Sequence, residues 1–181
     1  GSYTTTAAFN VFGTMNSQIT TGTSFGYIED ASGDITVDGK TYKKEASGTY
    51  TTTATTIDPY GTVRASQTIG ESTRGAVVIG AYTTDALFDV VGQQTSSVTT
   101  GTSKNISGYD TGSYTTTAAF NVFGTMNSQV TTGTSFGYIE DATGDITVDG
   151  KTYKKEASGT YTTTATTIDP YGTVRASQTI G

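Results

Sequence analysis

The chain repeats itself almost without change. Residues 1–70 and 112–181 differ at only two positions, where Ile19 becomes Val130 and Ser32 becomes Thr143. The repeat period is therefore 111 residues. This periodicity constrains the fold strongly, because every copy must form the same local structure and can contact a neighbour of its own kind. Because near-identical copies share one role, repetition supplies a longer protein or a larger number of equal binding sites.

A shorter repeat lies inside the period. The segment GSYTTTAAFNVFG at 1–13 is echoed in register by GAYTTDALFDVVG at 80–92, and a looser copy begins at Gly48. The period therefore divides into sub-repeats at 1–47, 48–79 and 80–111, of which the first is longer because it contains an additional hairpin. At the level of domains, we expect β repeat copy 1 at 1–70, an intervening β segment at 71–111 and β repeat copy 2 at 112–181.

Side chains alternate in a way that predicts β-strands along the whole chain. In 3–11, one face would carry Tyr, Thr, Ala, Phe and Val, and 82–90 shows the same alternation. The dipeptide Asp38-Gly39 between alternating segments predicts a type I′ hairpin. No segment has the pattern of an amphipathic helix. The predicted fold is all-β, made of tandem antiparallel β-sandwich or meander modules, and the alternative is a continuous β-solenoid of 32-residue sub-motifs.

Composition argues against several functional classes. The chain has no cysteine and no histidine, which excludes disulfide scaffolds, thiol or histidine catalysis and a usual zinc site. The net charge is −6 and no basic patch is present, so we expect no nucleic-acid partner. No apolar stretch reaches the ~20 residues of a membrane span, so we expect no membrane insertion. Asp30 and Asp34 form the one conceivable acid–base pair, on an expected exposed turn, and we therefore predict that the protein is not an enzyme.

An acidic loop occurs in each copy and is a candidate calcium site. Calcium binds several oxygen atoms of closely spaced carboxylates. The loop departs from the EF-hand pattern, because its glycine comes one place early and no glutamate follows at the twelfth position. A solvated turn is the alternative explanation, since aspartate favours turns. The candidate ligands are Asp30, Asp34 and Asp38 in the first copy and Asp141, Asp145 and Asp149 in the second.

Tyrosines provide a second candidate site. A tyrosine ring has an apolar body and a polar tip, which suits stacking on surface glycans and equally suits packing within a sheet. The tyrosines considered are Tyr3, Tyr27, Tyr42, Tyr50, Tyr60 and Tyr82.

In repeat length, repeat identity and threonine-rich composition, the chain resembles the tandem-repeat stalk regions of large bacterial cell-surface adhesins. The resemblance covers the whole chain at this level and involves no family motif. It implies an extracellular spacer at the cell surface, with calcium-stiffened linkers in many such proteins and neighbouring copies of the same repeat as partners. Two alternatives stay open: a multivalent carbohydrate-binding module, and a self-assembling subunit of an extracellular filament whose strand edges pair.

Overall fold

The computed structural model describes all 181 residues, which form β-strands joined by short turns. The chain contains no helix that is long and apolar enough to cross a membrane. The strands are β1 (Ser2–Phe9), β2 (Met15–Glu29), β3 (Ile35–Val37), β4 (Lys40–Ile57), β5 (Val63–Arg74), β6 (Val77–Phe88), β7 (Gln94–Lys104), β8 (Asp110–Phe120), β9 (Met126–Glu140), β10 (Ile146–Val148), β11 (Lys151–Ile168) and β12 (Val174–Ile180).

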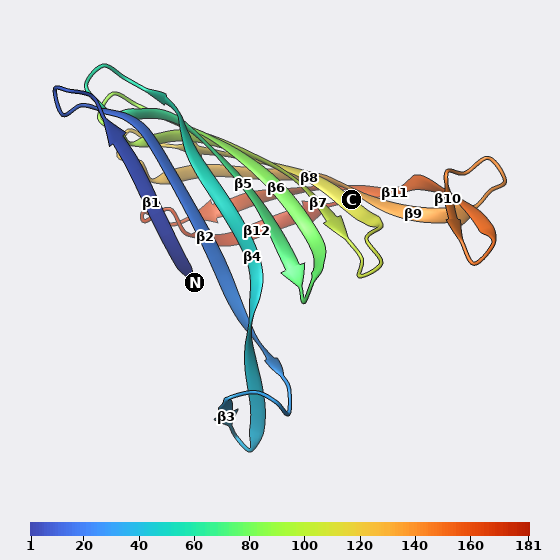
Figure 1. The fold of residues 1–181 in the computed structure, drawn as a ribbon. Helices are drawn as coiled ribbons and strands as arrows, with labels where there is room; N and C mark the ends of the chain where they lie inside the picture. The colour runs from blue at the N-terminus through green and yellow to red at the C-terminus, as the bar shows by residue number, and fades with distance from the viewer.

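All strands belong to one antiparallel sheet. Its main path is a meander in the order β1-β2-β4-β5-β6-β7-β8-β9-β11-β12, and the short strands β3 and β10 pair with β4 and β11 outside that path (Figure 1). The sheet is open, with β1 at one edge and β12 at the other. The all-β meander predicted from the sequence is thus confirmed, and it has neither the second layer of a sandwich nor the stacked coils of a solenoid.

The sheet has a small interior. Only five residues are buried, and the buried apolar side chains are Ala86 and Ala118. Threonine, serine, alanine and glycine occupy most positions on both faces, so neither face offers the apolar area that packing against a second sheet requires. Backbone pairing, with 113 backbone hydrogen bonds, therefore carries most of the structure.

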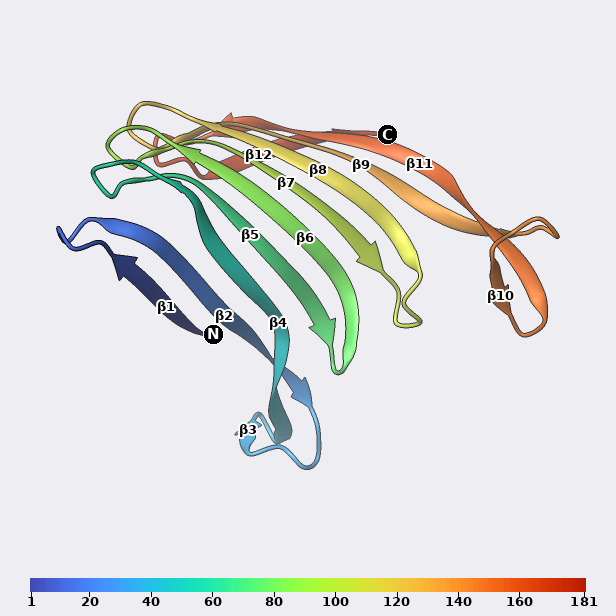
Figure 2. The ribbon, with the colours of Figure 1, turned by 45° about the horizontal axis from the view of Figure 1, so that its top comes forward.

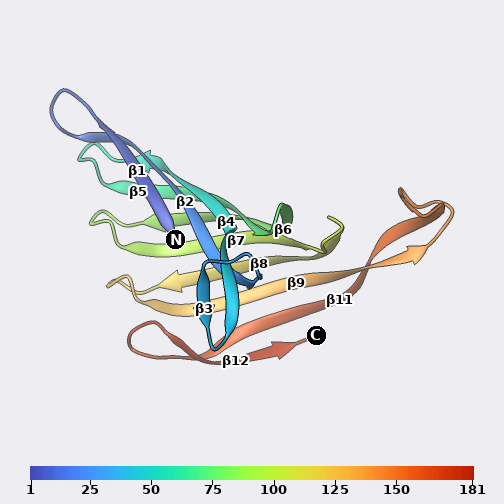
Figure 3. The ribbon, with the colours of Figure 1, turned by 60° about the horizontal axis from the view of Figure 1, so that its bottom comes forward.

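Two hairpin arms extend beyond the sheet. One is formed by the ends of β2 and β4 with β3, and the other by the equivalent ends of β9 and β11 with β10. In Figures 1, 2 and 3 the two arms point in different directions, because the sheet twists between them. At the tip of the first arm, Asp38 and Gly39 have φ values of 49° and 77°, which confirms the type I′ hairpin.

A recurring turn connects many strands. In the first turn, the side-chain oxygen of Asn10 accepts hydrogen bonds from the backbone N–H groups of Phe12 and Thr14, at 2.9 and 3.0 Å. Gly13 then adopts a φ of 80°. The first strand consequently ends at Phe9, and Val11, which the alternation placed in the strand, lies at the turn tip and is 92% exposed. The same turn begins at Asp58, Asp89, Asn105, Asn121 and Asp169.

The repeat copies merge without a gap. The boundary at 70/71 lies within β5, and the boundary at 111/112 lies within β8. Strand β8, which spans the second boundary, pairs with β7 in the same antiparallel way as strands within a copy pair with each other. The period is therefore a property of the sequence, whereas the sheet is continuous across it.

Candidate functional site: the tyrosine–glycine row

A row of alternating tyrosine and glycine residues crosses the sheet at one level. Each sub-repeat contributes a strand with a tyrosine, followed by a strand with a glycine at the directly opposed position. The sequence of opposed residues is Tyr3, Gly22, Tyr50, Gly70, Tyr82, Gly101, Tyr114, Gly133 and Tyr161. We call this set the tyrosine–glycine row.

Four of the five rings in the row lean the same way, each over the glycine of the preceding strand. The Tyr82 ring covers Gly70 of the preceding strand, and a methyl group built on Gly70 would overlap that ring. Glycine is required there because any larger residue would displace the aromatic ring. The same arrangement recurs for Tyr50 over Gly22, Tyr114 over Gly101 and Tyr161 over Gly133.

A second row, of threonines, runs parallel to the first on the same face. Thr84 lies two residues after Tyr82 along its strand, and its hydroxyl lies 2.8 Å from that of Thr99 on the next strand. These cross-strand pairs give each hydroxyl group a hydrogen-bond partner on the neighbouring strand. Equivalent hydroxyl pairs link Thr5 with Thr20, Thr52 with Thr68, Thr116 with Thr131 and Thr163 with Thr179.

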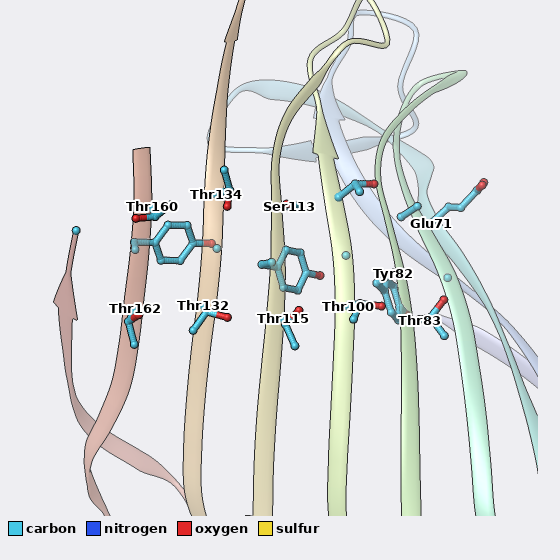
Figure 4. A pocket seen from close by; sticks show the side chains of 18 of the residues that line it. Glu71, Tyr82, Thr83, Thr100, Ser113, Thr115, Thr132, Thr134, Thr160 and Thr162 are labelled. Atoms are coloured by element: carbon cyan, nitrogen blue, oxygen red, sulfur yellow. The ribbon is translucent and has the colours of Figure 1, made fainter. Parts of the chain in front are cut away.

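At the level of the tyrosine–glycine row the sheet is hollowed into a groove of about 1020 Å³, lined mainly by the residues that flank the row along each strand, such as Thr83, Thr100 and Thr115. Figure 4 shows Tyr82 and the surrounding threonines that line it. Tyr82, Tyr114 and Tyr161 are also among its lining residues, and the groove ends at Ile180 and Gly181. Apart from tyrosine hydroxyls, Glu71 supplies the one ionisable side chain among the lining residues. The groove therefore offers mainly threonine hydroxyl and methyl groups to a neutral partner.

The tyrosines singled out in the sequence lie in different places. Tyr3, Tyr50 and Tyr82 belong to the tyrosine–glycine row. Tyr27 and Tyr42 lie on the first hairpin arm, and Tyr60 lies at a turn tip, 92% exposed. Sequence reasoning missed the glycine partners, although a glycine in the middle of each strand following a tyrosine strand is a visible signal.

The acidic loops form turns whose carboxylates are bonded locally. Asp30 accepts hydrogen bonds from the backbone N–H and the hydroxyl of Ser32, at 2.8 and 2.7 Å, and these bonds lower the pKa of Asp30. In the second copy Asp141 accepts the same bonds from Thr143, with the same lowering of its pKa. The exchange of serine for threonine between the copies thus retains the hydroxyl that bonds the carboxylate.

No group of three or more acidic side chains gathers in a way that would hold a metal ion. Asp34 and Asp145 follow the turn glycines, and Asp38 and Asp149 lie at the type I′ turns. Calcium binding at these loops stays a prediction. Calorimetric titration of the chain with calcium, beside its Asp30→Asn, Asp141→Asn variant, checks it. Heat that the double variant abolishes would support the site, and absence of heat would reject it.

One electrostatic contact ties the second copy to the segment before it. Asp110 on β8 accepts hydrogen bonds from Lys104 on β7, at 2.6 Å, and from Lys155 on β11, at 3.0 Å. The hydrogen bond from Lys104 is the main cause of a lowered pKa of the Asp110 carboxyl, and the hydrogen bond from Lys155 is the second. The hydroxyl of Tyr138 donates to the backbone oxygen of Asp110, at 2.7 Å. These bonds join the base of the second hairpin arm to the sheet.

Comparison with known proteins assigns no family and no function to the chain. No family model, no curated protein and no solved structure matches the chain.

Proposed function

We propose that the protein is a structural repeat of a larger extracellular surface protein, in which successive copies extend one continuous sheet and act as a stalk or spacer. The role is mechanical: copy number sets the reach of the protein. The observation that carries this proposal is the tyrosine–glycine row, which crosses the boundary between copies unchanged.

Contacts at the boundary support the proposal. Tyr114 opens the second copy and covers Gly101 of the preceding segment, just as Tyr82 covers Gly70 within the period. A further copy would therefore add to the sheet by the same contacts that hold the existing strands together. Because each strand contacts only its neighbours, stability should accumulate roughly additively along the array.

The proposal predicts a length. Six strand-to-strand steps separate β1 from β8, its counterpart one period later. At ~4.8 Å per step, each added period should lengthen the sheet by about 29 Å along its curved path. Solution X-ray scattering and electron microscopy of this chain, and of a chain with one more period, test the prediction. A longest dimension that does not grow with the added period would reject the spacer role.

The extracellular location is tested separately. Antibodies raised against the repeat should label intact, unpermeabilised cells that produce the full protein. Labelling that requires permeabilisation would contradict the location while leaving the length prediction untouched.

A second candidate function is carbohydrate binding, which the groove favours because three tyrosines and a series of hydroxyl-bearing threonines are among its lining residues. Hydroxyl groups and aromatic residues with a polar tip suit contact with sugars. Retention on immobilised polysaccharides tests this function, with Tyr114→Ala as the groove variant and Tyr60→Ala as the control at an exposed turn. Retention lost in the first variant alone would favour the carbohydrate-binding module over the spacer.

A further inference from the structure

Five turns lie at one end of the sheet and carry apolar residues at their tips. They connect β1 to β2, β4 to β5, β6 to β7, β8 to β9 and β11 to β12, and Figures 1 and 2 show them together at the end away from the hairpin arms. Their two central residues read Val-Phe, Pro-Tyr, Val-Val, Val-Phe and Pro-Tyr, at 11–12, 59–60, 90–91, 122–123 and 170–171. We call these ten residues the apolar rim.

The side chains of the apolar rim are exposed to solvent. Its valine, phenylalanine and tyrosine side chains are 69–92% exposed, and none of its residues is charged. The opposite end of the sheet differs: there β5 joins β6 through Gly75 and Ala76, β7 joins β8 through Ile106 and Ser107, and the two arms carry the acidic loops. Apolar tips are therefore concentrated at one end. Exposed apolar groups gathered in this way mark a site of contact with a protein or a membrane.

The turns that carry the rim pack against one another at their bases. A methyl group built on Gly61 would meet the side chain of Thr14, in the preceding turn, at 3.2 Å. Gly92 lies in the same way beside Thr62. Since one tip occurs for every two strands, neighbouring tips are about 10 Å apart. The rim is therefore a line of protruding points on a continuous base.

Each turn also satisfies most of its own backbone donors. The Asp58 side chain accepts hydrogen bonds from the N–H groups of Tyr60 and Thr62, at 3.0 and 2.9 Å. The Asp58 backbone oxygen accepts a bond from Gly61, and the Asp58 N–H donates to the backbone oxygen of Thr62. Pro59 has no N–H, so every backbone donor in this turn is paired. The last turn repeats this pattern, and each valine turn leaves one N–H unpaired. Donors paired within a turn can leave water at little cost, which an apolar environment requires.

The charges nearest to the rim are largely balanced. The carboxylates of Asp58 and Asp169, at the base of the two proline turns, are each 14% exposed. A guanidinium nitrogen of Arg64 lies 3.8 Å from the first carboxylate, and one of Arg175 lies 2.6 Å from the second. Asp89 forms no ion pair, and no lysine lies in the five turns. The rim therefore offers no excess positive charge to anionic lipid, and contact with a membrane would rest on apolar burial.

We propose that the apolar rim seats in the surface of a lipid bilayer with zwitterionic headgroups, so that the sheet stands on its turns. A bilayer suits a line of protruding points because mobile lipid fills the space between them, whereas a folded partner would need a matching cavity for each point. Tyrosine favours the boundary between water and hydrocarbon, and Tyr60 and Tyr171 lie at the two proline tips. Tips of two residues reach only that boundary. The contact needs no spanning segment, and it departs from the sequence-based expectation of no membrane insertion.

This inference goes beyond the stalk proposal, which concerns the direction in which copies are added. Each period supplies three turns of the rim, at 10–14, 58–62 and 89–93, so affinity for a bilayer should rise with copy number. A sheet that lengthens with added periods without binding vesicles would leave the stalk intact and reject the bilayer contact. A sheet that binds vesicles without lengthening would do the reverse.

Flotation with phosphatidylcholine vesicles tests the contact. The parent chain should float with the vesicles, and the double variant Phe12→Ser, Phe123→Ser should lower the partition coefficient at least about tenfold, because it removes apolar area that the bilayer buries. The matched control is Tyr27→Ser, Ile106→Ser, which removes apolar side chains from an arm and from a turn at the opposite end. All four side chains are 59–89% exposed, so neither double variant should impair folding. Phosphatidylserine added to the vesicles should not strengthen binding.

A fluorescent label provides the second measurement, because the chain has no native cysteine. A polarity-sensitive fluorophore on Tyr60→Cys should shift its emission to the blue when phosphatidylcholine vesicles are added, and the same label on Ile106→Cys should emit as in water. The proposal is overturned if the parent chain does not float, if both labels respond alike, or if binding requires phosphatidylserine. It is also overturned if the parent associates with itself in lipid-free sedimentation and the rim variant abolishes that association, since a second copy would then cover the rim.

Discussion

The ring of Tyr82 on β6 lies over Gly70 on β5, in the space that a methyl group on residue 70 would occupy. The ring covers backbone that glycine leaves bare, and the glycine leaves the space that the ring occupies. This contact recurs across the sheet, so a tyrosine that reads as a candidate ligand platform in the sequence is first a packing element of the sheet.

Replacing the glycine tests that contact. Gly70→Ala should lower the free energy of unfolding by about 1–3 kcal/mol, because its methyl group displaces the Tyr82 ring. Denaturant unfolding followed by tyrosine fluorescence measures the change, since the chain contains no tryptophan. The matched control is Gly26→Ala in β2, where an added methyl group meets only Ser47 Cβ at 3.6 Å. Equal losses in both variants would contradict the packing role of the row.

The recurring turn predicts that its first residue acts as a hydrogen-bond acceptor. Asp89 accepts bonds from the backbone N–H groups of Val91 and Gln93, both at 2.9 Å. Asp89→Asn should retain these bonds, as Asn10 does at the equivalent position, and should leave stability nearly unchanged. Asp89→Ala should cost about 1 kcal/mol. Thermal unfolding of the two variants gives the comparison, and an asparagine variant as unstable as the alanine variant would rule out this explanation.

The threonine row predicts a difference between single and double substitutions. Thr84→Val leaves the half-buried hydroxyl of Thr99 without its partner and should cost about 1 kcal/mol. Adding Thr99→Val removes the unpaired hydroxyl and should restore most of that loss, because valine suits a strand. A double-mutant cycle measured by denaturant unfolding gives the coupling. The exposed pair of Thr5 and Thr20 should show little coupling, since water can replace each partner.

Asp110 predicts a dependence of stability on pH. Its bonds to Lys104 and Lys155 lower its pKa in the folded chain below the ordinary value of about 3.9. The stabilisation of the folded state by the ionised Asp110 carboxylate is therefore complete above that ordinary value. It is lost as the pH falls through the lowered folded pKa. Asp110→Asn should lower the melting temperature at pH 7, and the difference from the parent should shrink below about pH 4. Asp149→Asn, which removes a carboxylate that forms no ion pair, is the control. A difference that stays constant down to pH 2 would contradict the argument.

Local features of the fold were predictable where a few neighbouring residues decide the outcome. Asp38 and Gly39 predicted a type I′ hairpin because few dipeptides tolerate two positive φ angles. The ends of strands were less predictable, because the side chain of Asn10 captures two backbone N–H groups and ends the strand where alternation would continue it. For the candidate site, the sequence identified tyrosines such as Tyr50 but not the partner Gly22 beneath the ring, because the register between strands is a long-range property.

The sequence by itself determined the period, the all-β class, the alternation of strand faces and the chemistry of the turns, since each depends on residues close together in the chain. Only the tertiary structure decided that the copies join in a single sheet, and that Tyr82 lies over Gly70. Pairing partners are chosen by strand register, and register depends on the combined fit of side chains between whole strands.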